Sequence, residues 1–492
     1  MRKIFFALLV IIFAVNFLHS ELNFSGVDKR KFVNVNRIIE NRNYFVDKLQ
    51  VQALYNQFRM GLKFDYYKPH FDKFLLITND MGDDTIELAL ESEEDEYYFD
   101  EYYLQYESDN WFVQAGTYEA VIGSGIVLHN FYDDDFELDS RLIGGYVNPV
   151  YDRWQIQLFS GFMESDNPAP AFEDEYDQIG AFDIDLNIVN NITFGGSYVL
   201  HREVIAKDEF NDRTIYAGKL NFSSSPLDFQ TEYATSNDDN EVTGTAFYSN
   251  FTSYIGKFTL MGAYKNYENF NVRISDLPMV NHAGQQLEHS WDTGKDEEGL
   301  MGEIRFLPNY ENEFVINYAE GWNNNSKVRL SNLYSEFKHN FEEWSIEAEF
   351  ELLEQLNKED ANMWYQEITP KLTFDFLIKN SPVLLKAEYQ YKEEDKITGN
   401  HSHFEPRVQT DIAIGNYSLS VAVENQIGES ESAEDGDDGE YWIGGEIATT
   451  IFNNTDVRLF YGKEKGGVVC RNGVCKNQAE FDGLRLSVTT TF

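Results

Sequence analysis

The chain ends on the stretch that decides its fold, Leu484-Arg485-Leu486-Ser487-Val488-Thr489-Thr490-Thr491-Phe492. Apolar and polar residues alternate here with a period of two, so one face of the predicted strand is apolar and the other is polar. The pattern predicts a strand with lipid outside and water inside. A terminal aromatic residue is typical of the signal that the outer-membrane barrel assembly machinery reads. We assign this assembly signal to Leu484, Leu486, Val488 and Phe492.

The amino terminus predicts export. Met1-Arg2-Lys3 is basic, residues 4–15 are apolar, and His19-Ser20 offers a cleavage point, which together indicate a secretory signal peptide over residues 1–20. No later segment approaches the roughly 18 uninterrupted apolar residues of a membrane helix. Only helices and closed barrels satisfy every backbone polar group in lipid. We therefore expect residues 21–492 to form a single barrel domain in the outer membrane of a Gram-negative cell.

Composition supports a barrel and excludes one class of partner. Aromatic residues make up 15% of the chain, as expected for strands with aromatic girdles, while the mean hydropathy of -0.46 is too polar for a helical membrane protein. The formal net charge is -45, from 39 basic and 84 acidic residues. Nucleic acid is not expected as a partner, because phosphate binding requires the opposite sign of charge.

Two kinds of connection alternate along the chain and predict the topology, with short turns on the periplasmic side and long loops outside. The short connections are nearly free of acid: 148–150, 189–191, 223–226, 254–256, 378–382, 415–416 and 452–454. The acidic connections between them are 164–177, 237–241, 292–298, 354–360, 393–395 and 429–440.

Counting the strands between these connections predicts an all-β, antiparallel, up-and-down transmembrane barrel of about 24 strands, with a range of 22–26. Only residues 21–48 precede the first clear strand near Leu49, which is too short a segment for a folded domain. We expect no separate plug domain.

One connection carries an apolar run that a solvated loop would not need. After a strand over 111–118, residues 119–137 contain Gly123-Ser124-Gly125, then Ile126-Val127-Leu128, then Asp133-Asp134-Asp135. The apolar run predicts a segment that folds against the barrel interior and narrows it, with the three Asp side chains lining the path. An extra hairpin pair in the wall, with the glycines in its turn, remains the alternative.

The longest later connection, residues 269–298, holds Arg273, His282, His289 and Trp291. Long loops are usually functional or disordered. We favour a solvated cap over the mouth of the barrel, and a constriction or binding loop is the alternative.

The two cysteines flank a hairpin signal. In Cys470-Arg471-Asn472-Gly473-Val474-Cys475 the Asn-Gly pair predicts a type I' turn that places Cys470 directly across from Cys475. This predicts a disulfide at an external loop tip, where oxidation is possible. Metal-binding thiols and free thiols are the alternatives.

Motifs for chemistry are scarce. The sequence has no phosphate-binding loop, no Gly-x-Ser-x-Gly elbow and no His-Glu-x-x-His motif. His401, His403 and Glu405 share one face of a predicted strand and could hold a metal, but this spacing is common by chance. We therefore assign no catalytic residue, metal or cofactor, and we do not expect an enzyme.

Two blocks carry a resemblance to a known family. Residues 113–118 with Gly123-Ser124-Gly125, and residues 461–475 through 485–492, resemble an uncharacterised family of outer-membrane barrels from Bacteroidetes-type bacteria. The resemblance implies a porin-like barrel from a domain of unknown function. The glycine block is also similar to that of alginate-export-type barrels, whose conduit is basic whereas this chain is acidic.

These observations favour a porin-like channel for passive or facilitated passage of small solutes, with acidic external loops. The alternative is a structural or surface-interaction protein whose loops bind a partner, a glycan or divalent cations. The expected partners are the lipid bilayer, lipopolysaccharide, the barrel assembly machinery and small solutes.

The disulfide prediction is tested with a thiol reagent. Non-reduced protein should give no adduct at Cys470 or Cys475, and both should label after reduction. Two adducts before reduction would show that the pair is free.

Overall fold

The structure is a computed structural model. It describes residues 23–36, 41–68, 75–78, 85–88, 96–133, 138–164, 176–206, 209–238, 241–270, 272–284, 296–323, 328–357, 363–396, 399–428, 440–471, 474–478 and 480–492. No helix in this part of the chain is long and apolar enough to cross a membrane. The predicted signal peptide and most of the acidic loops lie outside the described residues.

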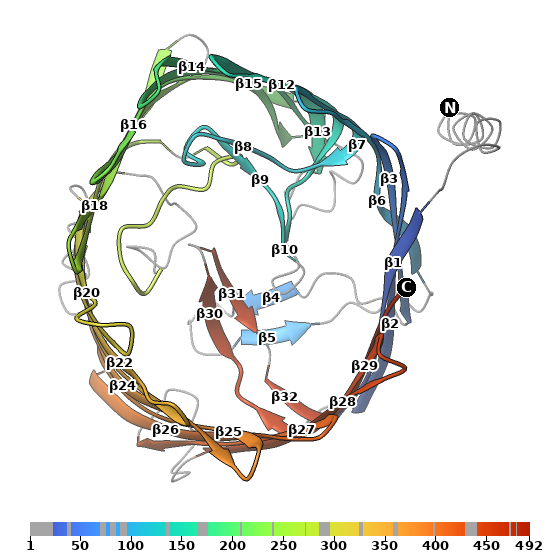
Figure 1. Ribbon diagram of the computed structural model, residues 1–492, viewed down its shortest axis with the longest axis vertical. Helices are drawn as coiled ribbons and strands as arrows, with labels where there is room; N and C mark the ends of the chain where they lie inside the picture. The colour runs from blue at the N-terminus through green and yellow to red at the C-terminus, as the bar shows by residue number, and fades with distance from the viewer. Residues whose placement is uncertain are drawn as a thin grey trace.

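The wall is one antiparallel sheet of 24 strands that closes on itself (Figure 1). Each wall strand pairs with the next one along the chain, and the last strand, β32, pairs with the first, β1. The wall strands are β1 (Asn23–Asn36), β2 (Asn41–Tyr55), β3 (Phe58–Lys68), β6 (Glu96–Glu107), β7 (Trp111–Tyr118), β12 (Leu142–Tyr151), β13 (Trp154–Glu164), β14 (Tyr176–Val189), β15 (Ile192–Ala206), β16 (Glu209–Ser224), β17 (Leu227–Asp238), β18 (Glu241–Ile255), β19 (Phe258–Glu268), β20 (Glu297–Phe306), β21 (Asn312–Asn323), β22 (Arg329–Asn340), β23 (Trp344–Asn357), β24 (Met363–Ile378), β25 (Ser381–Lys396), β26 (Gly399–Ile414), β27 (Tyr417–Gly428), β28 (Glu440–Ile451), β29 (Thr455–Glu464) and β32 (Phe481–Thr491).

The structure confirms the predicted all-β antiparallel barrel of 24 strands. Most short turns fall where the sequence predicts them, but the turn predicted at 148–150 is wrong. Strand β12 continues to Tyr151 and the turn follows it, because Pro149 interrupts only the pairing with β13 while β12 stays paired with β7. The acidic stretch 393–395 likewise lies within β25 and not in a loop. The absence of a separate plug domain stays a prediction.

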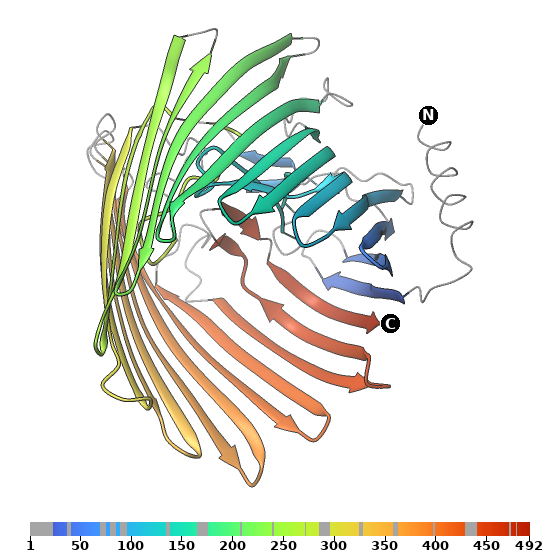
Figure 2. The same ribbon diagram turned by 45° about the horizontal axis from the view of Figure 1, so that its top comes forward.

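Four small hairpins branch from the long-loop end of the wall. They are β4 (Leu75–Thr78) with β5 (Thr85–Leu88), β8 (Ala120–Ile122) with β9 (Leu128–Asn130), β10 (Tyr132–Asp133) with β11 (Leu138–Asp139), and β30 (Gly467–Arg471) with β31 (Val474–Gln478). Figures 1 and 2 show β8–β9 and β30–β31 on the inner side of the wall.

The alternation of β32 fixes its two faces. Leu486 lies opposite Leu459 of β29 and Phe32 of β1, and both of these neighbours are 42% exposed. Arg485 lies opposite Phe460 and Val33, which are buried inside the barrel. The apolar face of the last strand therefore points outward.

The outer face carries an apolar band of the length that a membrane requires. Outward positions are apolar over 344–352 of β23, 368–376 of β24 and 383–391 of β25, which is nine residues on each strand. A tilted membrane strand needs about 9–11 residues. On all three strands the band ends at the same height, because Glu354, Gln366 and Glu393 lie side by side in register.

Aromatic rings follow the opposite, short-turn edge of this band. Ring centroids lie 4.6 Å apart for Phe258 and Phe306, 4.8 Å for Phe314 and Phe337, and 5.4 Å for Trp344 and Phe374. An aromatic girdle is typical of the membrane–water boundary of outer-membrane barrels. The outer surface is thus built to face lipid.

The facing of β32 predicts unequal effects of two neighbouring substitutions. Leu486→Arg places a charge near the membrane middle and should destabilise the barrel by about 2–4 kcal/mol. Ser487→Arg points inward beside Arg458, where repulsion in water should cost about 1 kcal/mol or less. The two variants are compared by the temperature at which each loses its compact form on a gel. Equal temperatures would contradict the assignment of Leu486 to the lipid face and Ser487 to the lumen face.

Candidate functional site

The first inner segment, residues 119–131, leaves β7 and runs inside the barrel (Figure 1). Its hairpin β8–β9 forms a sheet of its own and is not part of the wall, so the alternative of an extra wall hairpin is wrong. Ile126, Val127 and Leu128 are fully buried. The bend before them needs glycine, because Gly123 and Gly125 have φ values of +59° and +92°.

A second inner segment, residues 270–284, also lies inside the barrel, and Asn271 within it is outside the described residues. Phe270, Val272, Ile274 and Leu277 are buried in the same apolar cluster as the first inner segment. The solvated cap that we favoured is therefore wrong for residues 270–284. Residues 285–295, with His289 and Trp291, lie outside the described part.

Backbone hydrogen bonds join the two inner segments. The His129 amide donates to Ile274 O at 2.8 Å, and the Asp276 amide donates to Gly125 O at 3.1 Å. The His129 ring nitrogen Nδ1 lies 2.9 Å from the Asp276 carboxylate. The two segments thus form one packed unit, called the inner body below.

The inner body rests on an apolar patch of the lumen wall. The wall residues in this cluster come from β7 and from β12 to β19, and those of β13 to β19 include Phe159, Ile179, Val199, Ile215, Ala234 and Tyr267. A lumen wall exposed to water would be polar at these inward positions, so their apolar character is explained by the chain packed over them.

Just beyond its carboxyl end the first inner segment is tied to the neighbouring part of the wall, at β3 and the start of β12, through Tyr132. Lys63 Nζ lies 2.8 Å from the Tyr132 hydroxyl and 4.0 Å from its ring centre. The Arg141 guanidinium lies 4.2 Å from the same ring centre. Two cations against one aromatic ring hold Tyr132 between β3 and the start of β12.

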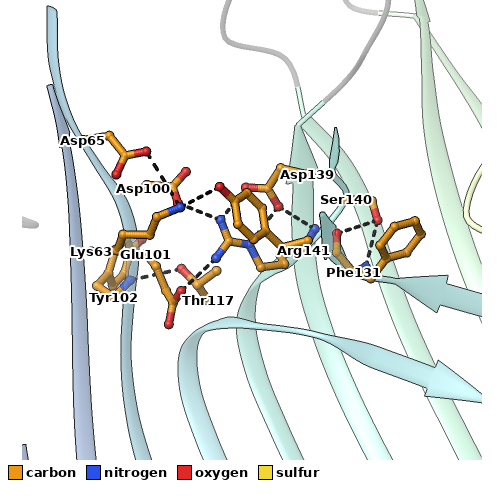
Figure 3. Close-up of polar contacts among 11 residues, drawn as sticks. Lys63, Asp65, Asp100, Glu101, Tyr102, Thr117, Phe131, Asp139, Ser140 and Arg141 are labelled. Atoms are coloured by element: carbon orange, nitrogen blue, oxygen red, sulfur yellow. Dashed lines mark hydrogen bonds and ion pairs between the residues drawn. The ribbon is translucent and has the colours of Figure 1, made fainter. Parts of the chain in front are cut away.

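Carboxylates hold these cations in place (Figure 3). Asp100 Oδ2 accepts from Lys63 at 2.6 Å and from Arg141 at 3.0 Å, so it links the two cations. Arg141 also donates to Glu101 at 2.9 Å and twice to Asp139, at 2.8 and 2.6 Å. We call this set of Lys63, Asp100, Glu101, Tyr132, Asp139 and Arg141 the latch.

The latch stabilises the charge of Arg141 despite its burial. Desolvation disfavours the guanidinium cation, but hydrogen bonds and attraction from Asp139 and Asp100 outweigh it and hold the pKa of Arg141 above its ordinary value. Arg141 stays charged at any accessible pH, so the latch does not titrate through its guanidinium.

The lumen face of β23–β27 is charged rather than apolar. Odd positions of β23 face inward, because Glu351 lies 3.7 Å from His282 of the inner body. Continuing this parity through the pairing register places ten carboxylates and four cations on the inner face, counting the residues whose side chains the structure describes. They are Glu347, Glu349, Glu351, Glu367, Asp375, Glu388, Glu394, Glu405, Asp411 and Glu424, against Lys371, Lys386, Lys392 and Arg407.

The candidate metal set does not assemble as a ligand sphere. His403 Nε2 lies 2.8 Å from Glu405, but Lys465 and Lys392 also contact that carboxylate, at 2.5 and 3.5 Å. Lysine cations at this distance compete with a metal ion for the carboxylate. Among the described residues no group of three or more His, Cys, Asp or Glu side chains is placed to hold a metal.

Other predicted residues are only partly described. Cys470 pairs with Cys475 in the β30–β31 register, and Arg471 pairs with Val474, as the Asn-Gly turn predicts. The side chains of both cysteines and of Asp133 lie outside what the structure describes, as do Asp134 and Asp135. The backbone of the cysteine hairpin lies on the inner side of the wall (Figure 1), and the disulfide and its location outside the cell stay predictions.

The terminal residue takes part in closing the wall. Gly26 of β1 and Phe492 exchange two backbone hydrogen bonds, of 2.8 and 3.0 Å. A Cβ at Gly26 would lie 2.5 Å from the Phe492 ring. The role of Phe492 as an assembly signal stays a prediction.

Sequence reasoning missed Lys63, Arg141 and Glu232. Lys63 and Arg141 form the latch, and Glu232 binds the Ser124 turn. A basic residue at an inward position of an acidic barrel was the only signal for the latch.

These features define a class: a closed, membrane-type β-barrel whose lumen contains folded-in chain segments. The chain belongs to a family of unknown function (DUF6029), whose model matches residues 13–361. The match includes the glycine block of the first inner segment and ends before the carboxyl-terminal block. An origin in Bacteroidetes-type bacteria stays a prediction.

Solved structures with similar architecture are distant in sequence. The P pilus usher (PapC) translocation pore has a TM-score of 0.48 and 8% identity, over 96% of this chain and 99% of that chain. The copper transporter OprC gives 0.48 and 8%, over 96% and 80%. The outer membrane transporter YddB from Escherichia coli gives 0.45 and 7%, over 96% and 81%. No functional argument rests on them, and no curated protein matches the chain.

The latch predicts that Arg141 is costly to replace. Arg141→Gln leaves the largely buried carboxylates of Asp100 and Glu101 without this cation, and we expect a loss of about 3–5 kcal/mol in unfolding free energy. Arg202→Gln removes an exposed ion pair with Asp212 and should change little. Urea unfolding in detergent micelles compares the two variants. Equal midpoints would show that the latch is not a stabilising contact.

Proposed function

We propose that the protein is an outer-membrane channel for small polar solutes, which pass through the lumen between the inner body and the wall strands β23–β27. The charged inner face of these strands is the observation that carries the proposal. An apolar outer band and a charged inner face are what a water-filled path through lipid requires. The apolar side of the inner body packs on β13–β19, and its residues His282 and Ala283 reach β22 and the edge of the charged face at Glu351.

The charge of this face favours cations. Ten carboxylates against four cations, among the side chains that the structure describes, give the inner face of β23–β27 a net negative charge. A confined path lined by one sign of charge concentrates the opposite ion. Asp133, Asp134 and Asp135, if they line the same path, would strengthen the preference.

The remaining parts of the proposal concern the surroundings of the barrel. Export through a cleaved signal peptide over residues 1–20, insertion by the barrel assembly machinery and contact with lipopolysaccharide are consistent with the apolar band and girdle. We propose no enzymatic activity, metal or cofactor. If no conductance is found, the alternative function is favoured, in which the protein binds a partner through its external loops.

Cation selectivity is tested by the reversal potential of single channels under a salt gradient. Glu351→Gln with Glu367→Gln should lower the ratio of cation to anion permeability, because two inward charges are removed. The matched control is Glu354→Gln on the outward face of β23, which should leave the ratio unchanged. The cation preference of the wild-type protein should also weaken as the pH falls toward about 4, the ordinary pKa of a carboxyl group.

Replacing Asp133, Asp134 and Asp135 with Asn should lower selectivity in the same way without changing barrel assembly. An anion preference in the wild type would contradict the proposed selectivity. A conductance no larger than leak would contradict the channel itself.

A further inference from the structure

Glu232 of β17 is a buried carboxylate that binds the turn of the inner body. Its side chain is 1% exposed. Oε2 accepts two hydrogen bonds from Ser124, one from the backbone amide at 2.8 Å and one from the hydroxyl at 2.7 Å. These are the hydrogen bonds that the described residues provide to this carboxylate, and Oε1 has none among them.

The cation nearest in the register does not replace these bonds. Lys219 of β16 lies directly opposite Glu232, but its Nζ is 2.8 Å from Asp183 and 3.0 Å from Asp185. A buried carboxylate is costly unless donors satisfy it. Docking of the Ser124 turn and burial of Glu232 therefore depend on each other.

The turn is shaped to reach this carboxylate. Gly123 has φ +59°, and a Cβ at this position would lie 2.4 and 2.6 Å from the two Glu232 oxygens. Only a residue without a side chain allows the backbone so close. The Gly123-Ser124 sequence is thus explained by its contact with Glu232 as well as by the bend.

Backbone hydrogen bonds connect the Ser124 turn to the rest of the inner body. Gly125, one residue after Ser124, accepts a hydrogen bond from the Asp276 amide, and His129 donates to Ile274 O. These bonds connect the Ser124 turn, and so Glu232, with both inner segments.

We propose that Glu232 is a positioning residue of the channel: by holding the Ser124 turn it fixes the inner body against β13–β19 and sets the width of the path beside it. The effect of Glu232 on the width of the path rests on the proposed channel function, whereas the contact between Glu232 and the Ser124 turn does not. The two parts are therefore tested by different measurements.

Hydrogen exchange of the full-length protein in detergent micelles tests the contact. Glu232→Leu removes the acceptors at similar volume, so the amides of Ser124, His129 and Asp276 should exchange faster while wall amides keep their protection. Glu232→Gln retains an oxygen that can accept both bonds and should restore wild-type protection. The matched control is Glu303→Gln, a buried inward carboxylate on β20 that bonds Asn317 and should leave these amides unchanged.

Unchanged exchange in Glu232→Leu would overturn the proposal. So would equally faster exchange in Glu232→Leu and Glu232→Gln, because the loss would then follow the charge and not the acceptor.

Single-channel conductance in planar bilayers tests the consequence. Glu232→Leu should give a higher and more variable conductance than the wild type, with Glu232→Gln near the wild-type level. Faster exchange without a change in conductance, in a wild type that conducts, would show that the inner body does not set the width and would overturn the proposal. No conductance in any of the proteins would contradict the channel function, while the exchange result would still decide whether Glu232 anchors the turn.

Discussion

Closure of the sheet into a ring without free strand edges determines how every wall strand is placed. In lipid no water satisfies a backbone amide or carbonyl, so a sheet survives there only without free edges. The pairing of β1 with β32 supplies this closure, over the register from Val27 with Thr491 to Val35 with Gly483. Once the ring is closed, the period of two decides which residues face lipid and which face the lumen. The apolar outer band and the charged inner face follow from that.

The inner body is a departure from this simple division. Along β13–β19 many of the inward positions form an apolar patch, which in an open lumen would expose hydrophobic surface to water. The two inner segments cover this surface and form a small core inside the barrel. Polar contacts hold the core against the wall at several places, among them the latch near β3 and β6, the Ser124 turn at β17 and the bonds of the His282 and Ala283 amides to Asn332 of β22. The lumen is thus divided into a packed side and a polar side.

Much of the wall could be predicted from the sequence, because alternation is local. Strand number and most short turns needed only the period of two and the positions of Gly, Asn and acidic runs. Pro149 shows the limit: it suggested a turn, but its missing amide was accommodated inside β12. Ile126-Val127-Leu128 pointed to an inward segment, since three buried apolar residues need a partner surface. In contrast, residues 270–284 have a mixed composition, and their burial depends on contacts with strands far away in the chain.

The polar contacts of the site could not be predicted from one sequence. With 84 acidic and 39 basic residues, any pairing of Lys63 with Asp100 or of Ser124 with Glu232 is one of very many. Only the fold brings residues 108 positions apart to within hydrogen-bonding distance, as it does for Ser124 and Glu232.

In the proposed channel, the first inner segment narrows the path through the closed barrel. The most direct measurement is the single-channel conductance of a variant lacking residues 123–131, compared with the wild type in the same bilayer, after gel mobility has shown that both barrels are assembled. The deletion variant should show a clearly higher conductance than the wild type, because the segment that narrows the path is removed. An assembled deletion variant with unchanged or lower conductance would contradict it.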